Sequence, residues 1–108
     1  MAYTDTETLL TMLESNLELI LDYMDEESKA KKEAELTLYL ESAKEFIERE
    51  GISIDDTQGD AQLIVMYANW LYDRRNASQS GYRDSTGAMP HMLRWNLNNR
   101  LFSQKVNE

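Results

Sequence analysis

The stretch AQLIVMYANWLY, residues 61–72, decides the fold of this chain. Only Gln62 and Asn69 in it are polar, so a helix built from it is apolar on nearly every side and has to be enclosed. A chain of 108 residues has little material for this, because a domain of this size buries only about two-thirds of the surface of its unfolded chain. The segment is therefore either the core of the domain or a helix that needs neighbouring molecules.

The composition indicates one small all-α domain, residues 1–108. The chain has 4 Gly and 1 Pro, which favours few turns and long helices, and 42% hydrophobic with 29% charged residues is typical of a globular protein. It has no Cys, which excludes disulfides, thiolate metal sites and cysteine nucleophiles. No window approaches the ~20 apolar residues of a membrane span, and the start MAYTDTETLL lacks a secretory pattern. We therefore expect a soluble intracellular protein that has no membrane contact.

The net charge of −9 is distributed unevenly along the chain. Residues 1–60 carry 17 acidic and 5 basic side chains, whereas residues 61–108 carry 3 and 6. Such runs usually mark solvated surface. Alternatively, they give the molecule complementary surfaces, through which copies stack side against side in a heterologous contact that closes into a ring if the rotation permits. Charge alone leaves both interpretations open.

Apolar spacings of three and four predict four helices, at about residues 5–16, 28–50, 59–75 and 90–102. Thr4 and Glu7 have the spacing of a capping box, which predicts the start of the first helix. The charged stretch from Asp22 to Glu35 has little apolar periodicity and indicates a solvated linker that merges into the second helix. Gly51 is expected to end that helix in a left-handed conformation.

The segments between and after the helices are expected to be turns and loops. Ile52 and Ile54 are predicted to fold over the core, and Asp56 or Thr57 to cap the third helix. The polar residues 76–88 predict a surface loop, long enough to suggest contact with a partner. Pro90 is expected in the first turn of the fourth helix, and the C-terminal tail 103–108 is expected to be flexible.

The apolar stripes of these helices supply the candidate core and interface residues. Aromatic and aliphatic side chains at helical spacing are more often core than ligand site, which is the interpretation we give Tyr67 and Trp70. The full set is Leu36, Leu40, Phe46, Ile47, Leu63, Tyr67, Trp70, Leu71, Met92, Leu93, Trp95, Leu97 and Leu101.

The sequence offers no motif for catalysis or metal binding. His91 is the sole histidine, and no serine–acid or second-histidine pattern accompanies it, so a surface or cap position is expected. The aspartates around Gly59 superficially resemble a calcium loop that starts at Asp55. The glycine is one place early, however, and the twelfth position is Met66 instead of a bidentate glutamate. We therefore expect no enzyme, no cofactor and no bound metal.

The arginines of the second half are the only basic concentration. Together with Trp95 they resemble a weak nucleic-acid-binding patch, which keeps a small helical regulatory or nucleic-acid-binding module open as an alternative function. The sequence pI of about 4.5 opposes it, because the neutralisation of phosphate is the main source of such affinity. These arginines are Arg74, Arg75, Arg83, Arg94 and Arg100.

Three blocks of the chain together resemble the small all-helical head-to-tail connector (adaptor) family of tailed bacteriophages and prophages. The blocks are YLESAKEFIEREGI (39–52), AQLIVMYANWLYDRR (61–75) and MPHMLRWNLNNRLF (89–102), with a polar loop between the last two. The resemblance implies a structural, non-catalytic subunit that forms a ring of about a dozen copies below the portal protein. Such a ring extends the DNA channel and carries the next tail-joining protein. The resemblance also implies a location in the host cytoplasm before assembly and in the virion neck afterwards.

Further residues of this chain are candidates for the contacts of such a ring, as expectations. Double-stranded DNA would pass through the ring without specific binding, because an acidic wall repels phosphate and lets DNA slide. The candidate channel-facing acids are Asp22, Asp25, Glu26 and Glu27, although this charged stretch looks longer than is usual for the family. The candidate partner contacts are Arg74, Arg75, Tyr82, Arg83, Arg94, Arg100 and Phe102.

Overall fold

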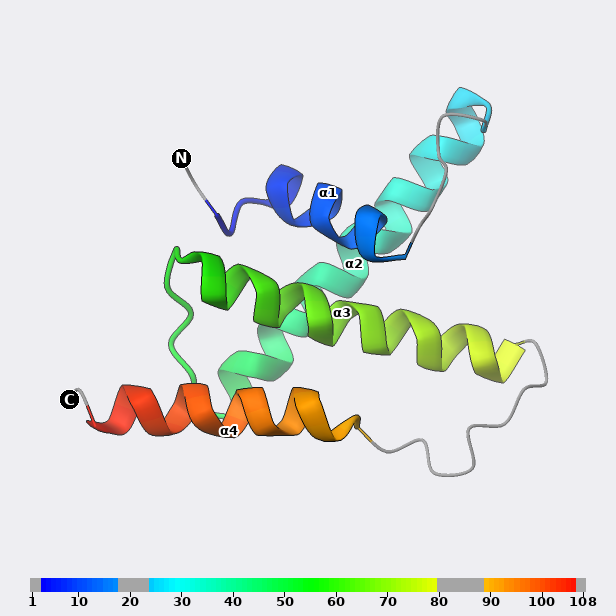
Figure 1. Ribbon diagram of the computed structural model, residues 1–108. Helices are drawn as coiled ribbons and strands as arrows, with labels where there is room; N and C mark the ends of the chain where they lie inside the picture. Colours follow the sequence, from blue (N-terminus) through cyan, green and yellow to red (C-terminus); the bar gives the residue numbers. More distant parts are fainter. Residues whose placement is uncertain (1–2, 18–23, 80–88, 107–108) are drawn as a thin grey trace.

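The computed structural model has four helices, α1 (Thr6–Asn16), α2 (Glu26–Arg49), α3 (Gln58–Gln79) and α4 (His91–Val106) (Figure 1). The structure describes residues 3–17, 24–79 and 89–106, with the side chains of 75–79 excepted. No strand occurs within these ranges. The prediction of a small all-α domain is confirmed.

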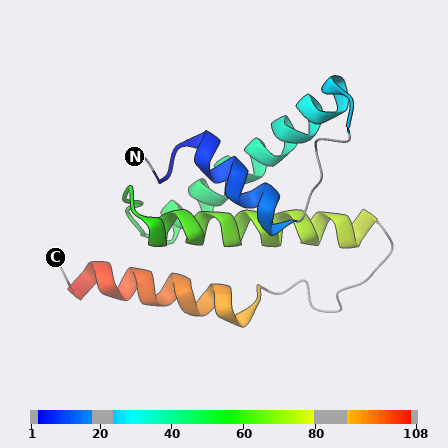
Figure 2. The same cartoon turned by 45° about the horizontal axis from the view of Figure 1, so that its top comes forward.

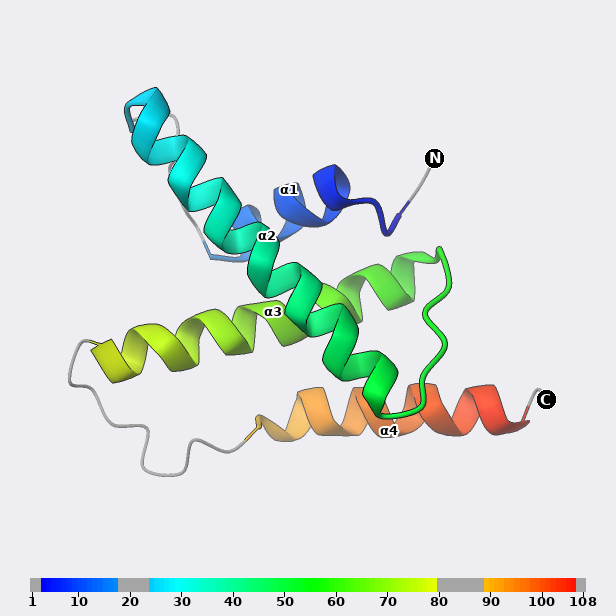
Figure 3. The same cartoon turned by 180° about the vertical axis from the view of Figure 1, so that it is seen from behind.

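Helix α3 is the centre of the arrangement. It packs against α1, α2 and α4, and α2 crosses it obliquely on the side seen in Figure 3. Helix α4 runs beside α3 in the opposite direction, so that its C-terminal end lies near the start of α3 (Figures 1 and 2). The principal extents of 48 × 39 × 19 Å describe a thin slab, in which each outer helix keeps one side turned to solvent.

The apolar stretch 61–72 is enclosed by the molecule itself. Ala61, Ile64, Val65 and Ala68 are at most 1% exposed. Of the two possibilities that the sequence left open, the first therefore holds, because α3 forms the core of a single molecule and does not depend on neighbours for its burial.

The candidate core residues divide into buried, half-buried and exposed groups. The buried ones are Leu36, Leu40, Ile47, Leu63, Tyr67, Leu93 and Leu97, and Trp70, Leu71 and Leu101 are partly buried against them. Phe46, Met92 and Trp95 are exposed, so they lie outside the buried core, and a place in an interface stays a prediction for them. For the residues of α4 the reason is geometric, since Leu93, Leu97 and Leu101 already fill the side that faces α3, and residues one or two places away point elsewhere.

The first helix starts differently from the predicted capping box. Asp5 is the N-cap, and its carboxylate accepts a hydrogen bond of 2.7 Å from the backbone N–H of Thr8. Thr4 instead uses its backbone N–H and its hydroxyl to donate to Oδ1 of Asp56, at 2.8 and 3.0 Å. A carboxylate distant in sequence thus takes the donors of Thr4, which a local motif cannot reveal.

The ends of α2 follow the same local rules. Asp25 caps the helix by accepting from the backbone N–H of Ser28 at 2.7 Å, so α2 begins at Glu26, two residues before the predicted start. Gly51 follows the helix with φ +98°, as the prediction of a left-handed stop requires. Ile52 is buried and Ile54 packs against the core, which confirms that this connection folds back.

Two predicted boundaries of α3 and α4 need correction. Thr57 accepts from the backbone N–H of Asp60 at 3.2 Å and so caps α3, but the helix continues to Gln79, through the first four residues of the predicted loop 76–88. Residues 80–88 lie outside the described part. The sequence missed residues 76–79 because they are polar and have no apolar periodicity by which a helix is recognised.

The start of α4 lies one residue later than predicted. Pro90 precedes the helix, and its carbonyl accepts from the N–H of Arg94 at 3.1 Å. The helix then continues to Val106, so the expectation of a flexible tail at 103–108 is wrong for residues 103–106. Gln104 explains the difference, since its amide donates to the carbonyl of Gly51 at 2.9 Å and accepts from the N–H of Ser53 at 2.7 Å.

Candidate functional site

The side of α4 that faces away from α3 carries an uncovered row of large apolar side chains. Met92, Trp95, Phe102 and Val106 are exposed to 64, 60, 68 and 64%. With Asn99 they are spaced three, four, three and four residues apart, which is the a/d spacing of a coiled-coil seam with a polar residue in its middle. We call these five residues the α4 outer stripe. Such a row on a helix is suited to contact with another helix.

The opposite side of α4 is held firmly against the rest of the domain. Leu93 and Leu97 are buried there, and Cδ1 of Leu101 lies at an ordinary contact distance, 3.6 Å, from the place of a Cβ added at Gly51. Helix α4 is therefore apolar on two opposite sides, of which its own chain covers one. The covered side alone is enough to pack α4 onto its own domain, so the uncovered side is not needed for the fold.

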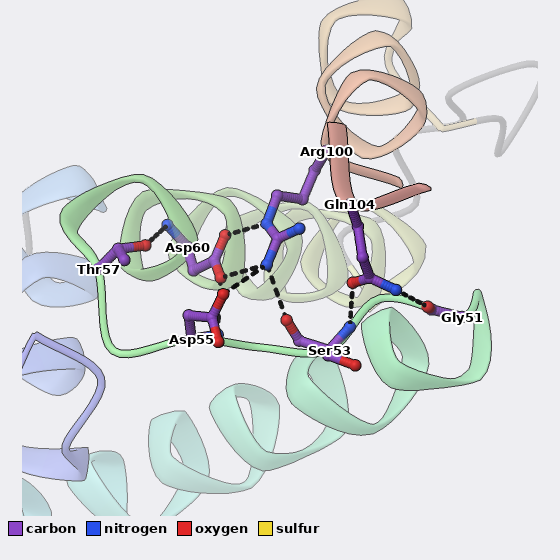
Figure 4. Close-up of polar contacts among 7 residues, drawn as sticks. All are labelled: Gly51, Ser53, Asp55, Thr57, Asp60, Arg100 and Gln104. Carbon is purple, nitrogen blue, oxygen red and sulfur yellow. Dashed lines mark hydrogen bonds and ion pairs between the residues drawn. The ribbon is translucent and has the colours of Figure 1, made fainter. Parts of the chain in front are cut away.

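A cluster of polar contacts fixes the inner side of α4 to the connection between α2 and α3 (Figure 4). The guanidinium of Arg100 donates to Oδ1 and Oδ2 of Asp60 at 2.7 and 3.1 Å, to the carbonyl of Ser53 at 2.8 Å and to Asp55 at 3.2 Å. The second carboxylate oxygen of Asp60 also accepts from the N–H of Asp55 at 2.8 Å. Asp60 is only 4% exposed, so the Arg100 charge compensates a buried carboxylate.

A hollow in the surface, lined by Ser53, Asp55, Asp60 and Arg100 among others, coincides with this cluster. The carboxylate of Asp60 and the guanidinium of Arg100 bond to other members of the cluster, so the arrangement serves to hold the chain together. Among the described residues, no group of three or more His, Asp or Glu side chains is placed to hold a metal ion.

The two α4 arginines that the sequence offered as partner contacts are engaged inside the molecule. Arg94 forms a two-pronged contact with Glu50, at 2.6 and 3.1 Å, and this hydrogen bonding raises the pKa of the guanidinium. Arg100 is committed to Asp60. Their positive charges are balanced by these carboxylates, so the contacts favour a structural role over partner binding.

Of the other candidate partner contacts, the structure places the side chains of Arg74 and Phe102 at the surface. The guanidinium of Arg74 lies 5.6 Å from the ring centre of Trp70, a cation–π contact at the surface. Phe102 is exposed on the α4 outer stripe. The side chain of Arg75 and residues Tyr82 and Arg83 lie outside the described part.

The candidate channel-facing acids sit at the start of α2. Asp25 caps the helix, and its bond from the Ser28 N–H lowers the pKa of the carboxyl. Glu26 and Glu27 occupy the exposed first turn, where a negative charge is favoured by the helix dipole. Asp22 lies outside the described residues. These acids therefore stabilise the start of α2, and because they are exposed they could also form part of a surface in an assembly.

A shallow hollow of about 200 Å³ between α3 and α4 adjoins the outer stripe at Met92. Asn69, Trp70 and Asp73 line its α3 side. Burial raises the pKa of Asp73, and the side-chain oxygen of Asn69 is buried without a donor among the described residues. A partner that covers the stripe would meet the exposed carboxyl of Asp73 here as well as apolar surface.

Sequence reasoning missed the meaning of the stripe, although the signal was present. The residues at 92, 95, 99, 102 and 106 follow a heptad pattern, whereas Leu93, Leu97 and Leu101 follow a spacing of four. The prediction from sequence places Met92 and Trp95 in one set with these leucines and does not separate the two rows. Leu38, exposed to 63% on the outer side of α2, was not singled out either. Two interleaved patterns on one helix indicate two apolar faces.

No protein-family model matches this chain, and neither the curated proteins nor the solved structures contain a significant match. None of the helices in the described ranges is long and apolar enough to cross a membrane.

Proposed function

We propose that this protein is a structural, non-catalytic head-to-tail connector of a tailed bacteriophage or prophage. Its copies assemble into a ring of about a dozen below the portal protein, extend the DNA channel and carry the next tail-joining protein. They act in the virion neck after assembly and reside in the host cytoplasm before it. The sequence blocks at 39–52, 61–75 and 89–102 suggest this identity, and the exposed α4 outer stripe is the structural observation that supports it most directly.

The stripe supports assembly because it is large and because the fold does not need it. Aromatic side chains bury about 150–250 Å² each, so Trp95 and Phe102 alone leave on the order of 250 Å² of apolar surface uncovered. Contiguous apolar patches of a few hundred Å² on a soluble protein commonly mark interaction sites. The core around Ile64 and Leu97 is complete without these side chains. The stripe is best understood as one half of an interface.

The charge of the molecule suits a channel through which DNA slides. The chain carries −9, and the first turn of α2 presents Glu26 and Glu27 to solvent. Such acids on a channel wall would repel phosphate and leave the DNA free to move, without specific binding.

The alternative of a nucleic-acid-binding module receives less support from the contacts. Nucleic-acid affinity depends on basic side chains that can neutralise phosphate. Arg94 and Arg100 are already paired with Glu50 and Asp60, so most of the positive charge of α4 is compensated within the molecule.

Assembly with the portal protein encoded in the same genome tests the proposal. The two proteins are mixed and imaged by electron microscopy, and rings of this chain docked on the portal are expected. Trp95→Glu is expected to abolish them, whereas Gln62→Glu, at an exposed position of α3, is the matched control that preserves them. Failure of the wild type to form rings alone and to bind the portal would refute the function.

A further inference from the structure

We infer that the α4 outer stripe of one molecule packs against the outer side of α2 of a second copy. The contact is heterologous, so each molecule offers α4 to one neighbour and α2 to another. This inference rests on the proposed function and names the pair of surfaces that joins its subunits.

The outer side of α2 is the counterpart because it combines small residues with one exposed leucine. Ala30, Ala34 and Leu38 follow one another at intervals of four and are all exposed, with Leu38 at 63%. The opposite side of the helix holds the buried Leu36 and Leu40. Figure 3 shows α2 lying across the front of the molecule with no other helix over it. We call Ala30, Ala34 and Leu38 the α2 ridge.

The two surfaces complement each other in side-chain size. Helices that pack closely set large side chains of one into gaps between side chains of the other. The stripe offers bulky Trp95 and Phe102, and the two alanines of the ridge leave room for them. A contact of the stripe with a second α4 would instead set bulky residues against bulky residues, which holds the helix axes apart.

The surfaces are also matched in length and are separated within one molecule. The α2 ridge, continued along the same side of the helix by Glu41 and Glu45, spans about 22 Å, and the α4 outer stripe spans about 21 Å, at a rise of about 1.5 Å per residue. Both surfaces lie on the side opposite the buried residues of their helix, so both turn away from α3. One molecule therefore cannot bring its own stripe and ridge together, and the contact has to continue from copy to copy.

Charge favours this pairing over contact between two α4 helices. Helix α4 contains no acidic residue, and Lys105 makes no ion pair with the described residues. The ridge is flanked by Glu41 and by the exposed pairs of Glu27 with Lys31 and Glu45 with Arg49. The two pairs are balanced, so Glu41 is the acid that the ridge side offers to the acid-free α4. Two molecules of net charge −9 can then approach without setting acid against acid. Glu41 is also suited to accept from the amide of Asn99 at the middle of the stripe.

The absence of cysteine from the natural chain allows a direct test by disulfide trapping. Leu38→Cys and Trp95→Cys are made separately, one carrying a size tag, and are mixed at high protein concentration with oxidised glutathione. We expect a mixed dimer of the two variants on a non-reducing gel and little dimer of either variant alone. A double variant is expected to form a series of longer chains, because each molecule then carries both halves of the contact.

An exposed position on another helix provides the control for this experiment. Gln62→Cys replaces either partner as an exposed control and is expected to give no mixed dimer, and the helical circular dichroism of every variant should match the wild type because the positions are exposed. A dimer formed by Trp95→Cys alone, without the mixed product, would show that two α4 helices pair and would overturn the inference. Absence of any specific cross-link would overturn it as well.

The trapping result is distinguishable from failure of the proposed function. If rings form on the portal but Leu38→Cys and Trp95→Cys do not cross-link within them, the subunit contact is wrong and the function stands. If the mixed dimer forms but the wild type neither forms rings nor binds the portal, the contact is right and the function is wrong.

Discussion

Helices α3 and α4 use apolar residues in opposite ways. Helix α3 contains the most apolar stretch of the chain, yet residues such as Ile64 and Ala68 are fully buried within one molecule. Helix α4 is less apolar, yet it leaves Met92, Trp95, Phe102 and Val106 at least 60% exposed. The comparison teaches that the distribution of apolar residues around a helix, and not their number, shows whether its burial is complete.

Position in the fold accounts for the difference. Helix α3 has neighbours on several sides, since α1, α2 and α4 all pack against it. Helix α4 lies at the edge of a slab 19 Å thick, where the domain covers only its inner side. Substitutions in the two helices should therefore differ in their effect on stability.

Truncation of one residue from each helix should separate core from surface. Ile64→Ala removes a fully buried side chain and is expected to lower the free energy of unfolding by about 2–5 kcal/mol. Trp95→Ala removes a larger but exposed side chain and should change it by no more than about 0.5 kcal/mol when measured on dilute monomer. Urea unfolding measures both. Equal losses would mean that α4 belongs to the core on both sides.

Loss of the Arg100 charge should show how strongly the inner side of α4 is held. Arg100→Met leaves the buried carboxylate of Asp60 without its cation, and we expect a loss of about 3 kcal/mol in the free energy of unfolding. Arg94→Met is the matched control, since its pair with Glu50 is more exposed and should contribute about 1 kcal/mol or less. The contrast fails if the two variants unfold at the same urea concentration.

A methyl group at Gly51 tests the turn that brings α2 against α4. Gly51→Ala forces an L-residue into φ +98°, which should cost about 1–2 kcal/mol, while the nearest side-chain atom, on Leu101, is at an ordinary contact distance. Gly59→Ala is the control, because a Cβ there meets nothing within 4 Å and alanine favours the helix. Thermal unfolding should therefore shift down for the first and stay level or rise for the second.

Acid should loosen the caps before it affects the core. Hydrogen bonds from backbone N–H groups lower the pKa values of Asp25 and Asp56, and bonds from Thr8 lower that of Asp5. A lowered pKa in the folded state means that the stabilisation is complete above the unfolded value of about 4 and is lost as the pH falls through the folded value.

The expected pH effect is the smallest of the series because these carboxylates are exposed. Thermal midpoints should be level near neutral pH and fall below about pH 4, and Asp56→Asn should reduce that fall by removing one of the three contributions. A midpoint that rises on acidification would contradict the assignment of these aspartates as caps and braces.

The sequence predicted the parts of the fold that depend on local rules. The four helices follow from apolar periodicity, and the stop at Gly51 and the fold-back of Ile52 follow from single residues and their surroundings. The sequence also limited the cap of α3 to Asp56 or Thr57, of which the structure uses Thr57. These features depend on residues that are neighbours in the sequence, so the sequence alone was enough to predict them.

Features that join distant segments could not be read in the same way. The bond of Thr4 to Asp56 spans 52 residues, and that of Arg100 to Asp60 spans 40, so no spacing rule links them. Arg100 looked like a free cation because its buried partner is far away in sequence. Trp95 was grouped among core and interface residues together, and only the packing of α4 shows which of the two apolar sides of this helix is covered.

Sedimentation velocity of the wild type and Trp95→Glu, over the same range of concentrations, tests most directly whether the exposed side of α4 is an assembly surface. The account predicts that the wild type shifts from monomer to larger species as its concentration rises, while Trp95→Glu remains monomeric and equally helical. Two proteins that both sediment as monomers at every concentration would contradict it.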